Sequence, residues 1–198
     1  MKLRVWMIRH GKTRGNLRGA YIGSTDEPLC PQGAEEIERL KGRGCYSQAE
    51  AVYTSPLLRC RQTAALIFPH QQAQIVESLR ECSFGEFEGK NYQDLNGDSR
   101  YQAWIDSGGT IPFPGGEDPM EFRRRCARGF LRLCREQKEK ERIAVICHGG
   151  TIMAVLEAFG QPAGDFYRWQ VKNGEGYSFL FDTSAEKAEQ IEKIAGES

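Results

Sequence analysis

Two histidines of this chain occupy matching places, each at the end of an apolar run and directly before a glycine. His10 follows residues 3–8, and His148 follows residues 143–147. Short apolar runs rich in β-branched residues are typical of buried parallel strands, and ligands bind at the carboxyl ends of such strands. Arg9 adds a fixed positive charge beside the first imidazole. Two imidazoles and a guanidinium at one edge of a sheet indicate phosphate chemistry.

A second guanidinium is expected at the same edge. The run 49–54 predicts another strand, and Ser55-Pro56 after it predicts the N-cap and first position of a helix that continues to about Phe68. Arg59 then lies near the amino end of this helix, where free backbone N–H groups and the helix dipole favour an anion. We therefore expect arginines, imidazoles and backbone donors around one phosphate group.

The sequence lacks the motifs of several other catalytic strategies. It has no G-x-S-x-G turn and no Walker A loop, and its 3 histidines come without an Asp-rich cluster that would suit a two-metal site. Histidine can itself be a covalent nucleophile. Gly11 leaves room for a phosphate to approach the ring of His10. This pattern favours His10 as the nucleophile.

Composition sets bounds on the class of protein. Equal numbers of basic and acidic residues, 27 of each, give no reason to expect a nucleic-acid or membrane partner. The 7 cysteines include no C-x-x-C pair, so we predict reduced, mostly buried thiols and a cytoplasmic location. We expect one domain over residues 1–198 that binds a small phosphomonoester and needs no metal or other cofactor. The sequence leaves a monomer and a homodimer open.

The chain alternates between strand and helix patterns. Asp118, with Glu121 three residues later, is close to a capping box and starts a long helix with an apolar face from Phe122 to Cys134. The polar tail 183–198 is predicted as weak helix or disorder. The alternation predicts a three-layer α/β/α domain with a mostly parallel central sheet. The other predicted elements are strands over about 2–9, 75–76, 143–147 and 177–181, and helices over about 31–42, 91–106 and 151–159.

Five motifs, in order, resemble the histidine phosphatase superfamily, the phosphoglycerate-mutase-like proteins. Lys12 departs from the pattern, since the family often has Glu there, and is expected to place another cation near the pocket. Cys30 departs too, where the family has Thr. The motifs are Arg9–Asn16 (R-H-G-x-T-x-x-N), Gly23–Gly33 (G-x-x-D-x-P-L-T-x-x-G), Ser55–Ala64 (S-x-L-x-R-A-x-Q-T-A), Leu79–Gly89 (L-x-E-x-x-x-G-x-x-E-G) and His148-Gly149-Gly150.

The resemblance implies a role for each site residue. His10 forms a phosphohistidine, and Glu81 first protonates the leaving oxygen and then activates water. Glu86 and Glu88 are rivals in the same loop, but the loop motif assigns the acid to Glu81. The remaining implied contacts are the phosphate-binding residues Arg9, Arg59, His148 and Asn16, and the substrate-binding backbone of Gly23.

Two reactions are compatible with these motifs. A phosphatase transfers the phosphoryl group to water, whereas a mutase returns it to the substrate at another position. Phosphoglycerate mutases of the family carry an insertion and paired arginines after the acid loop, whereas Gly89 here leads to a short helix without an Arg-Arg pair, and Ile22 replaces a small polar residue. This favours a phosphomonoesterase, with a cofactor-dependent phosphoglycerate mutase and a non-catalytic phospho-ligand binder as alternatives. The stretch from Trp104 to Glu117 resembles α-ribazole-5′-phosphate phosphatases of cobalamin assembly, and α-ribazole 5′-phosphate is the candidate substrate. Glu117 is either a substrate contact or a plain turn residue.

Overall fold

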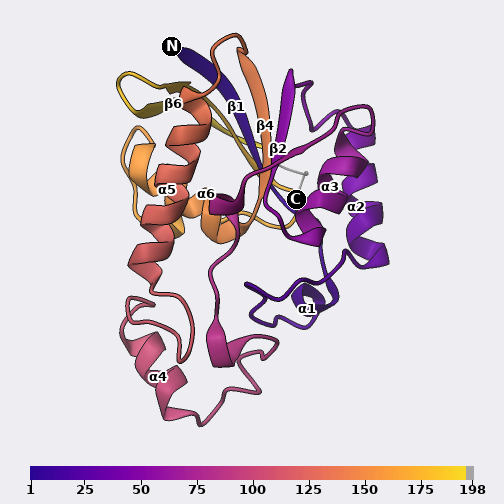
Figure 1. Ribbon diagram of the computed structural model, residues 1–198. Coiled ribbons are helices and arrows are strands. Elements are labelled where there is room, and N and C mark those ends of the chain that lie inside the picture. Colours follow the sequence, from indigo (N-terminus) through magenta and orange to yellow (C-terminus); the bar gives the residue numbers. More distant parts are fainter. Residues whose placement is uncertain (195–198) are drawn as a thin grey trace.

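The computed structural model describes residues 1–194 and shows a six-stranded sheet with helices on both faces (Figure 1). The strand order is β3-β2-β4-β1-β5-β6. Neighbours from β3 to β1 pair in parallel, and β5 and β6 pair antiparallel. The predicted three-layer α/β class is confirmed, with a mixed sheet. The strands are β1 (Lys2–Arg9), β2 (Ala51–Thr54), β3 (Gln74–Ile75), β4 (Arg142–Cys147), β5 (Gly176–Asp182) and β6 (Lys187–Ile194).

Each face of the sheet carries its own helices. On one face lie α2 (Pro31–Gly42) and α3 (Leu58–Ile67), and on the other lie α5 (Pro119–Arg135) and α6 (Gly149–Phe159) (Figure 1). Because both faces are covered, both sides of the central strands are apolar. The shorter elements are α1 (Arg14–Leu17), α4 (Ser99–Asp106) and the 3-10 helices η1 (Glu77–Leu79), η2 (Gly85–Phe87) and η3 (Phe166–Trp169).

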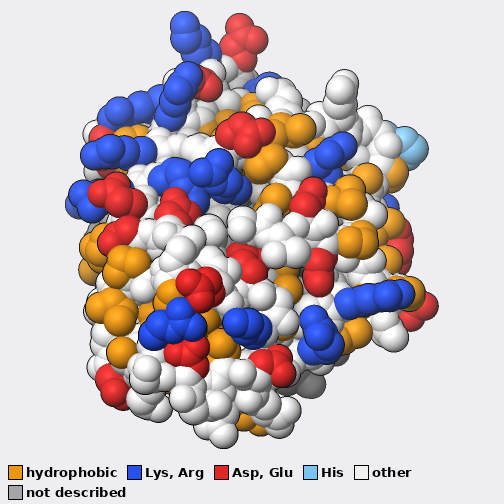
Figure 2. Space-filling view, turned by 60° about the horizontal axis from the view of Figure 1, so that its bottom comes forward, with side chains coloured by type: hydrophobic (Ala, Val, Ile, Leu, Met, Phe, Trp, Pro, Cys, Tyr) orange, Lys and Arg blue, Asp and Glu red, His pale blue; other side chains and the backbone are white. Residues whose placement is uncertain are grey.

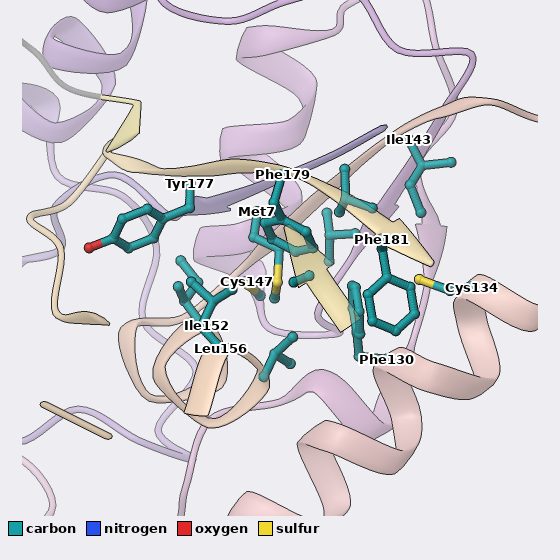
Figure 3. Packing of buried hydrophobic residues seen from close by; sticks show 14 of the residues in the cluster. Met7, Phe130, Cys134, Ile143, Cys147, Ile152, Leu156, Tyr177, Phe179 and Phe181 are labelled. Carbon is teal, nitrogen blue, oxygen red and sulfur yellow. The ribbon is translucent and has the colours of Figure 1, made fainter. Parts of the chain in front are cut away.

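Aromatic packing joins α5 to the central sheet. The ring of Phe130 lies 5.0 Å from that of Phe181 and 6.0 Å from that of Phe179, between centroids, and Figure 3 shows these rings interleaved beneath the strands. Burying a side chain of this size stabilises a fold by roughly 1.5–3 kcal/mol. This packing anchors β5, which pairs with β1, the strand that leads into the site.

A second, smaller cluster lies beyond the carboxyl ends of the strands, in the segment 84–117, which we call the aromatic cap. Its helix α4 lies apart from the sheet at the lower end of Figure 1. The ring of Phe113 lies 4.8 Å from Phe84 and 4.9 Å from Trp104, and Trp104 stacks on Tyr101. The cap therefore depends on ring contacts, with few hydrogen bonds to the sheet.

Two predicted elements need correction. Helix α4 begins at Ser99 instead of about residue 91, because the Asn91 side chain accepts hydrogen bonds from two following N–H groups and Gly97 adopts a φ of 87°. The prediction of weak helix or disorder from Thr183 is wrong for Lys187–Ile194, which form β6. Ala188 and Ile194 are buried and Ile191 is partly buried, and backbone pairing with β5 holds the remaining polar residues in the strand. Residues 195–198 lie outside the described part of the chain.

The prediction of mostly buried thiols is confirmed. Six of the seven cysteines are buried, and Cys45 is partly exposed. No helix within residues 1–194 is long and apolar enough to cross a membrane.

Candidate active site

The carboxyl ends of β1, β2 and β4 bring three motifs to one edge. Arg9 is in register with Cys147, so His10 and His148 follow at the same level. Their ring centroids lie 5.2 Å apart, with planes inclined by 66°. In the sheet, β4 and β1 are neighbours. The strand that follows β1 in the sequence, β2, lies beside β4, and the strand that follows β4, β5, lies beside β1. Open α/β sheets bind ligands at such a switch point.

The hydrogen bonds of His10 assign the ring hydrogen to one nitrogen and the lone pair to the other. Nδ1 lies 2.7 Å from the carbonyl oxygen of Gly11, and since a carbonyl only accepts, Nδ1 carries the hydrogen. Nε2 is then the acceptor for Arg59 Nε at 3.2 Å. Burial, followed by the charges of Arg59 and Arg9, holds the pKa of His10 well below its ordinary value. The ring is therefore neutral at pH 7 and offers the lone pair of Nε2.

Arg59 is fully buried and fixed on three sides. Besides contacting His10, it donates from Nη1 to the carbonyl of Thr25 and from Nη2 to the carbonyl of Gly23, both at 2.7 Å. Its helix α3 begins at Leu58, whose N–H donates to Asp26 Oδ1 at 2.6 Å. The loop that receives the guanidinium thus also caps the helix that carries it.

The predicted N-cap at Ser55 is wrong. Ser55 Oγ lies 2.7 Å from Nε2 of His148, and the residue at the cap position is Leu57. His148 is fully buried, and burial, followed by the charge of Arg59, holds its pKa well below the ordinary value. Ser55 therefore orients the second imidazole and does not start the helix.

The side chain of Glu81 joins the acid loop, residues 79–89, to the first turn of α6. Its carboxyl accepts from the N–H of Cys82 at 3.0 Å and from the N–H of Gly150 at 3.1 Å. Burial raises the pKa of Glu81, and outweighs the backbone donors and the two arginines, which lower it. A carboxyl whose pKa is raised by burial near a phosphate site suits the role of a general acid.

Arg9 has one buried donor without a partner among the described residues. Nη1 donates to the carbonyl of Val171 at 2.7 Å, but Nε is buried without a partner among the described residues. Neither Arg9 nor Arg59 forms an ion pair within residues 1–194, although burying a cation without its counter-ion costs several kcal/mol. The pair forms a preorganised site for an anion.

Asn16 and Gly23, the two weaker candidates, are held by the scaffold. Asn16 Oδ1 accepts from the N–H of Thr13 at 3.1 Å and from Asn173 Nδ2 at 3.2 Å, and the residue lines the cavity described below. The N–H of Gly23 donates to Glu88 at 3.0 Å, and Gly23 does not line that cavity. Asn173, which also donates to the His10 carbonyl at 3.0 Å, has no signal in the motifs.

The other charged candidates are engaged elsewhere. Glu88 accepts from the N–H groups of Gly23, Ser24 and Phe84, and Glu86 pairs with Arg100. Lys12 pairs with Glu36 at 2.7 Å and is absent from the cavity lining, so the expected extra cation is not supplied there. Glu117 pairs with Arg125, which makes it neither a substrate contact nor a plain turn residue. In the part of the chain described, no three histidine, cysteine or acidic side chains gather as metal ligands would.

A cavity of about 310 Å³ opens beside Arg9 and Glu81. Arg123 also lines it, but pairs with Glu157 at 3.0 Å and lies over the ring of Phe166, with 3.9 Å from Cζ to the centroid. The face of the molecule in Figure 2 mixes acidic and basic side chains, whereas Arg59 of the site is fully buried. The aromatic residues of the cavity wall are Tyr21, Phe84, Trp104, Phe113, Phe122, Phe166 and Tyr167.

The sequence and the fold have relatives of known structure. Residues 5–193 match the profile of the histidine phosphatase superfamily, branch 1. The adenosylcobalamin/alpha-ribazole phosphatase of Escherichia coli is 30% identical over 177 residues, covering 87% of each chain. The alpha-ribazole phosphatase of Shigella flexneri superposes with a TM-score of 0.81 at 27% identity, covering 94% of this chain and 93% of that chain. A phosphoserine phosphatase mutant from Entamoeba histolytica, in complex with phosphoserine, superposes with a TM-score of 0.77 at 27% identity, with 91% of each chain covered.

Proposed function

The chain belongs to the histidine phosphatase superfamily and is a phosphatase, and we propose that it hydrolyses a small phosphomonoester through a phosphohistidine at Nε2 of His10. One observation carries this proposal. Arg9 Nε is a buried donor without a protein partner, at the edge where the lone pair of His10 and the carboxyl of Glu81 also lie. A phosphate dianion satisfies that donor and supplies the missing counter-charge.

In the first half-reaction, His10 Nε2 attacks phosphorus while the bond to the leaving oxygen breaks. Glu81 gives its proton to that oxygen, so the leaving group departs as a neutral alcohol. Arg9 and His148 hold the transferring phosphoryl group, and Asn16 contributes a lesser contact. Arg59 donates to the carbonyls of Thr25 and Gly23, and the Nε–H group that now contacts His10 must leave Nε2 as it attacks and is then available to the phosphate, with the two N–H groups that have no protein partner. Gly23 acts through Arg59, whose position its carbonyl fixes.

In the second half-reaction, Glu81, now a carboxylate, removes a proton from water. The water oxygen attacks phosphorus, the bond to His10 Nε2 breaks, and phosphate leaves with the ring neutral again. Phosphoryl transfer depends mainly on positioning and charge stabilisation. The arginines supply that charge, and we expect turnover without an added metal.

We propose α-ribazole 5′-phosphate as the substrate. Its leaving group is a nucleoside with a planar benzimidazole base, and the cavity beside Glu81 has walls of aromatic rings that suit a planar base. The Escherichia coli and Shigella flexneri relatives are named for this ester. Six buried thiols favour a reducing compartment, and we place the reaction in the cytoplasm.

The alternatives lack support at the site. A phosphoglycerate mutase must bind a second phosphate or carboxylate, whereas Arg123, the cation on the outer wall of the cavity, is already neutralised by Glu157. A non-catalytic binder would have no use for a buried carboxyl of raised pKa beside a histidine of lowered pKa.

The test is phosphate release from α-ribazole phosphate, phosphoserine, 3-phosphoglycerate and a nucleotide. A preference of about a hundredfold in kcat/KM for α-ribazole phosphate, about 2.7 kcal/mol of transition-state discrimination, supports the assignment. A preference for another ester contradicts the substrate but not the reaction. Isomerisation of 3-phosphoglycerate without phosphate release contradicts the reaction itself.

A further inference from the structure

Arg125 of α5 lies behind the loop that carries Glu81, outside the substrate cavity. Its Nη1 donates to two backbone carbonyls, those of Ser78 at 2.9 Å and Arg80 at 3.0 Å. Arg80 is the residue directly before Glu81. A single nitrogen therefore fixes the backbone on the amino side of the acid.

The same guanidinium reaches the carboxyl side of the acid through Glu117. Nε and Nη2 of Arg125 pair with the two carboxylate oxygens of Glu117 at 2.9 Å and 2.7 Å. The N–H of Glu117 in turn donates to the carbonyl of Ser83 at 2.9 Å. The ion pair thus holds the loop on both sides of Glu81.

A close approach of α5 to η1 strengthens this attachment. A Cβ added at Gly129 would lie 2.1 Å from Ser78 Oγ and 2.5 Å from Ser78 Cβ, so only glycine allows the helix to sit this near. Gly129 and Arg125 are one turn apart on α5 and contact the same residue. The helix therefore meets the acid loop at two points.

We propose that Arg125, together with Glu117, is the positioning pair for the general acid Glu81. The inference rests on the proposed role of Glu81 and extends it to residues that the five motifs do not contain. Because the charge of Arg125 is neutralised by Glu117, the pair acts by fixing the loop backbone and not by attracting the phosphate. The carboxyl itself is then aimed by the N–H groups of Cys82 and Gly150.

The role predicts a selective loss of activity. A catalytic group misplaced by about 1 Å can cost about 10²-fold in rate. The loss belongs only to the step in which Glu81 donates its proton, which is the breaking of the ester bond. A leaving group that departs without a proton does not need a well-placed acid, so its ester is spared.

The experiment compares phenyl phosphate with 2,4-dinitrophenyl phosphate, using kcat/KM because this constant reports the steps up to the first ester cleavage. Arg125→Ala and Arg125→Lys are made separately, since lysine keeps the charge but cannot bridge two carbonyls and a carboxylate. We expect each to lose about 30- to 100-fold on phenyl phosphate and about threefold or less on 2,4-dinitrophenyl phosphate. Arg124→Ala is the matched control, because Arg124 is the neighbouring exposed arginine and pairs with Glu121 on the same helix.

Glu81→Gln distinguishes the acid role of Glu81 from the positioning role of Arg125. If Glu81→Gln shows the same leaving-group dependence and Arg125→Ala adds little in that background, the two residues act as one unit and the proposal holds. An equal loss on both esters for Arg125→Lys, or a loss that adds fully to that of Glu81→Gln, means a structural role only and overturns it. Should Glu81→Gln itself show no leaving-group dependence, the acid assignment fails and the positioning role fails with it.

Discussion

The strand-end cluster, formed by Arg9, His10, Arg59, Glu81 and His148, and the aromatic cap meet at one cavity, which Arg9 and Glu81 line on the cluster side, but the two regions are built differently. The side chains of the cluster are held mainly by hydrogen bonds, and Arg9 Nε is a buried atom without a partner among the described residues. The cap has hydrogen bonds and ion pairs at Glu86, Glu88 and Glu117, but its inner packing consists of ring contacts, such as Trp104 on Phe113 at 4.9 Å.

The difference separates reaction from selectivity. A hydrogen-bonded cluster at the ends of packed strands has one arrangement, which suits a reaction that depends on position. Rings permit sliding and exchange with little polar cost, which suits a wall that chooses among leaving groups. Changes in the cluster should therefore affect all substrates, and changes in the cap only some.

The largest expected effect is in the cluster. His10→Ala removes the nucleophile, and we expect kcat to fall by at least about 10⁴-fold for every ester tested. The matched control is His70→Ala, since His70 is the exposed histidine. Rapid-quench trapping of an acid-labile phosphoenzyme checks the reason for the loss. Retained turnover in pure protein would remove the cluster from the reaction.

The next effect concerns Glu81 and is visible in pH dependence. Glu81 must be protonated to act as the acid, and burial raises its pKa, so activity persists above the ordinary carboxyl range and is lost as pH rises through the raised value. His10 must be neutral, and its lowered pKa moves the loss at acid pH well below the ordinary imidazole range. Glu81→Gln should lower kcat/KM on phenyl phosphate by about 10²- to 10⁴-fold and remove the basic limb. A basic limb unchanged in Glu81→Gln would assign it to another group.

A smaller and selective effect is expected in the cap. Trp104→Ala removes a ring from the cavity wall and should lower kcat/KM on α-ribazole phosphate by about tenfold, since stacking on a base contributes about 1–3 kcal/mol. Hydrolysis of phosphoserine, which has no ring, should change by about twofold or less. The control is Tyr92→Ala, a cap residue that is 66% exposed. An equal loss on both esters would erase the distinction between the two regions.

The smallest effect is on stability. Ser55→Ala leaves Nε2 of the buried His148 with only the weak contact to Cys60 Sγ at 3.5 Å in place of its 2.7 Å partner, and a poorly satisfied buried group costs about 1 kcal/mol or more. Urea unfolding at pH 7.5 measures this loss, with Ser47→Ala as a control at an exposed serine. A variant as stable as the parent would mean that His148 finds another partner.

The sequence predicts the cluster well because strand ends align by register. Once β1 and β4 pair, Arg9 meets Cys147, and the next residues must be neighbours. The N-cap at Ser55 fails for a physical reason, since a distant imidazole competes for the hydroxyl. Propensity rules describe only local partners.

The structure of the cap and the Arg125–Glu117 ion pair could not be predicted from strand register or local propensity. Residues 91–98 look helical by pattern, but the Asn91 side chain and Gly97 form turns instead. The β6 strand is polar and becomes a strand only because β5 offers an edge. Contacts of this kind depend on the assembled fold, and no local pattern reports them.

The place of β1 in the sheet has a consequence for how the enzyme folds during its synthesis. The strand that carries the nucleophile is made first, yet its partners β4 and β5 are made much later, at Arg142–Cys147 and Gly176–Asp182. Long-range pairing of this kind slows folding, because a large loop must close before contacts are gained. A chain cut before Gly176 contains every residue of the strand-end cluster but leaves β1 with an open edge where β5 would pair. We therefore expect such a chain to carry all the catalytic side chains and still lack the complete sheet that positions the nucleophile.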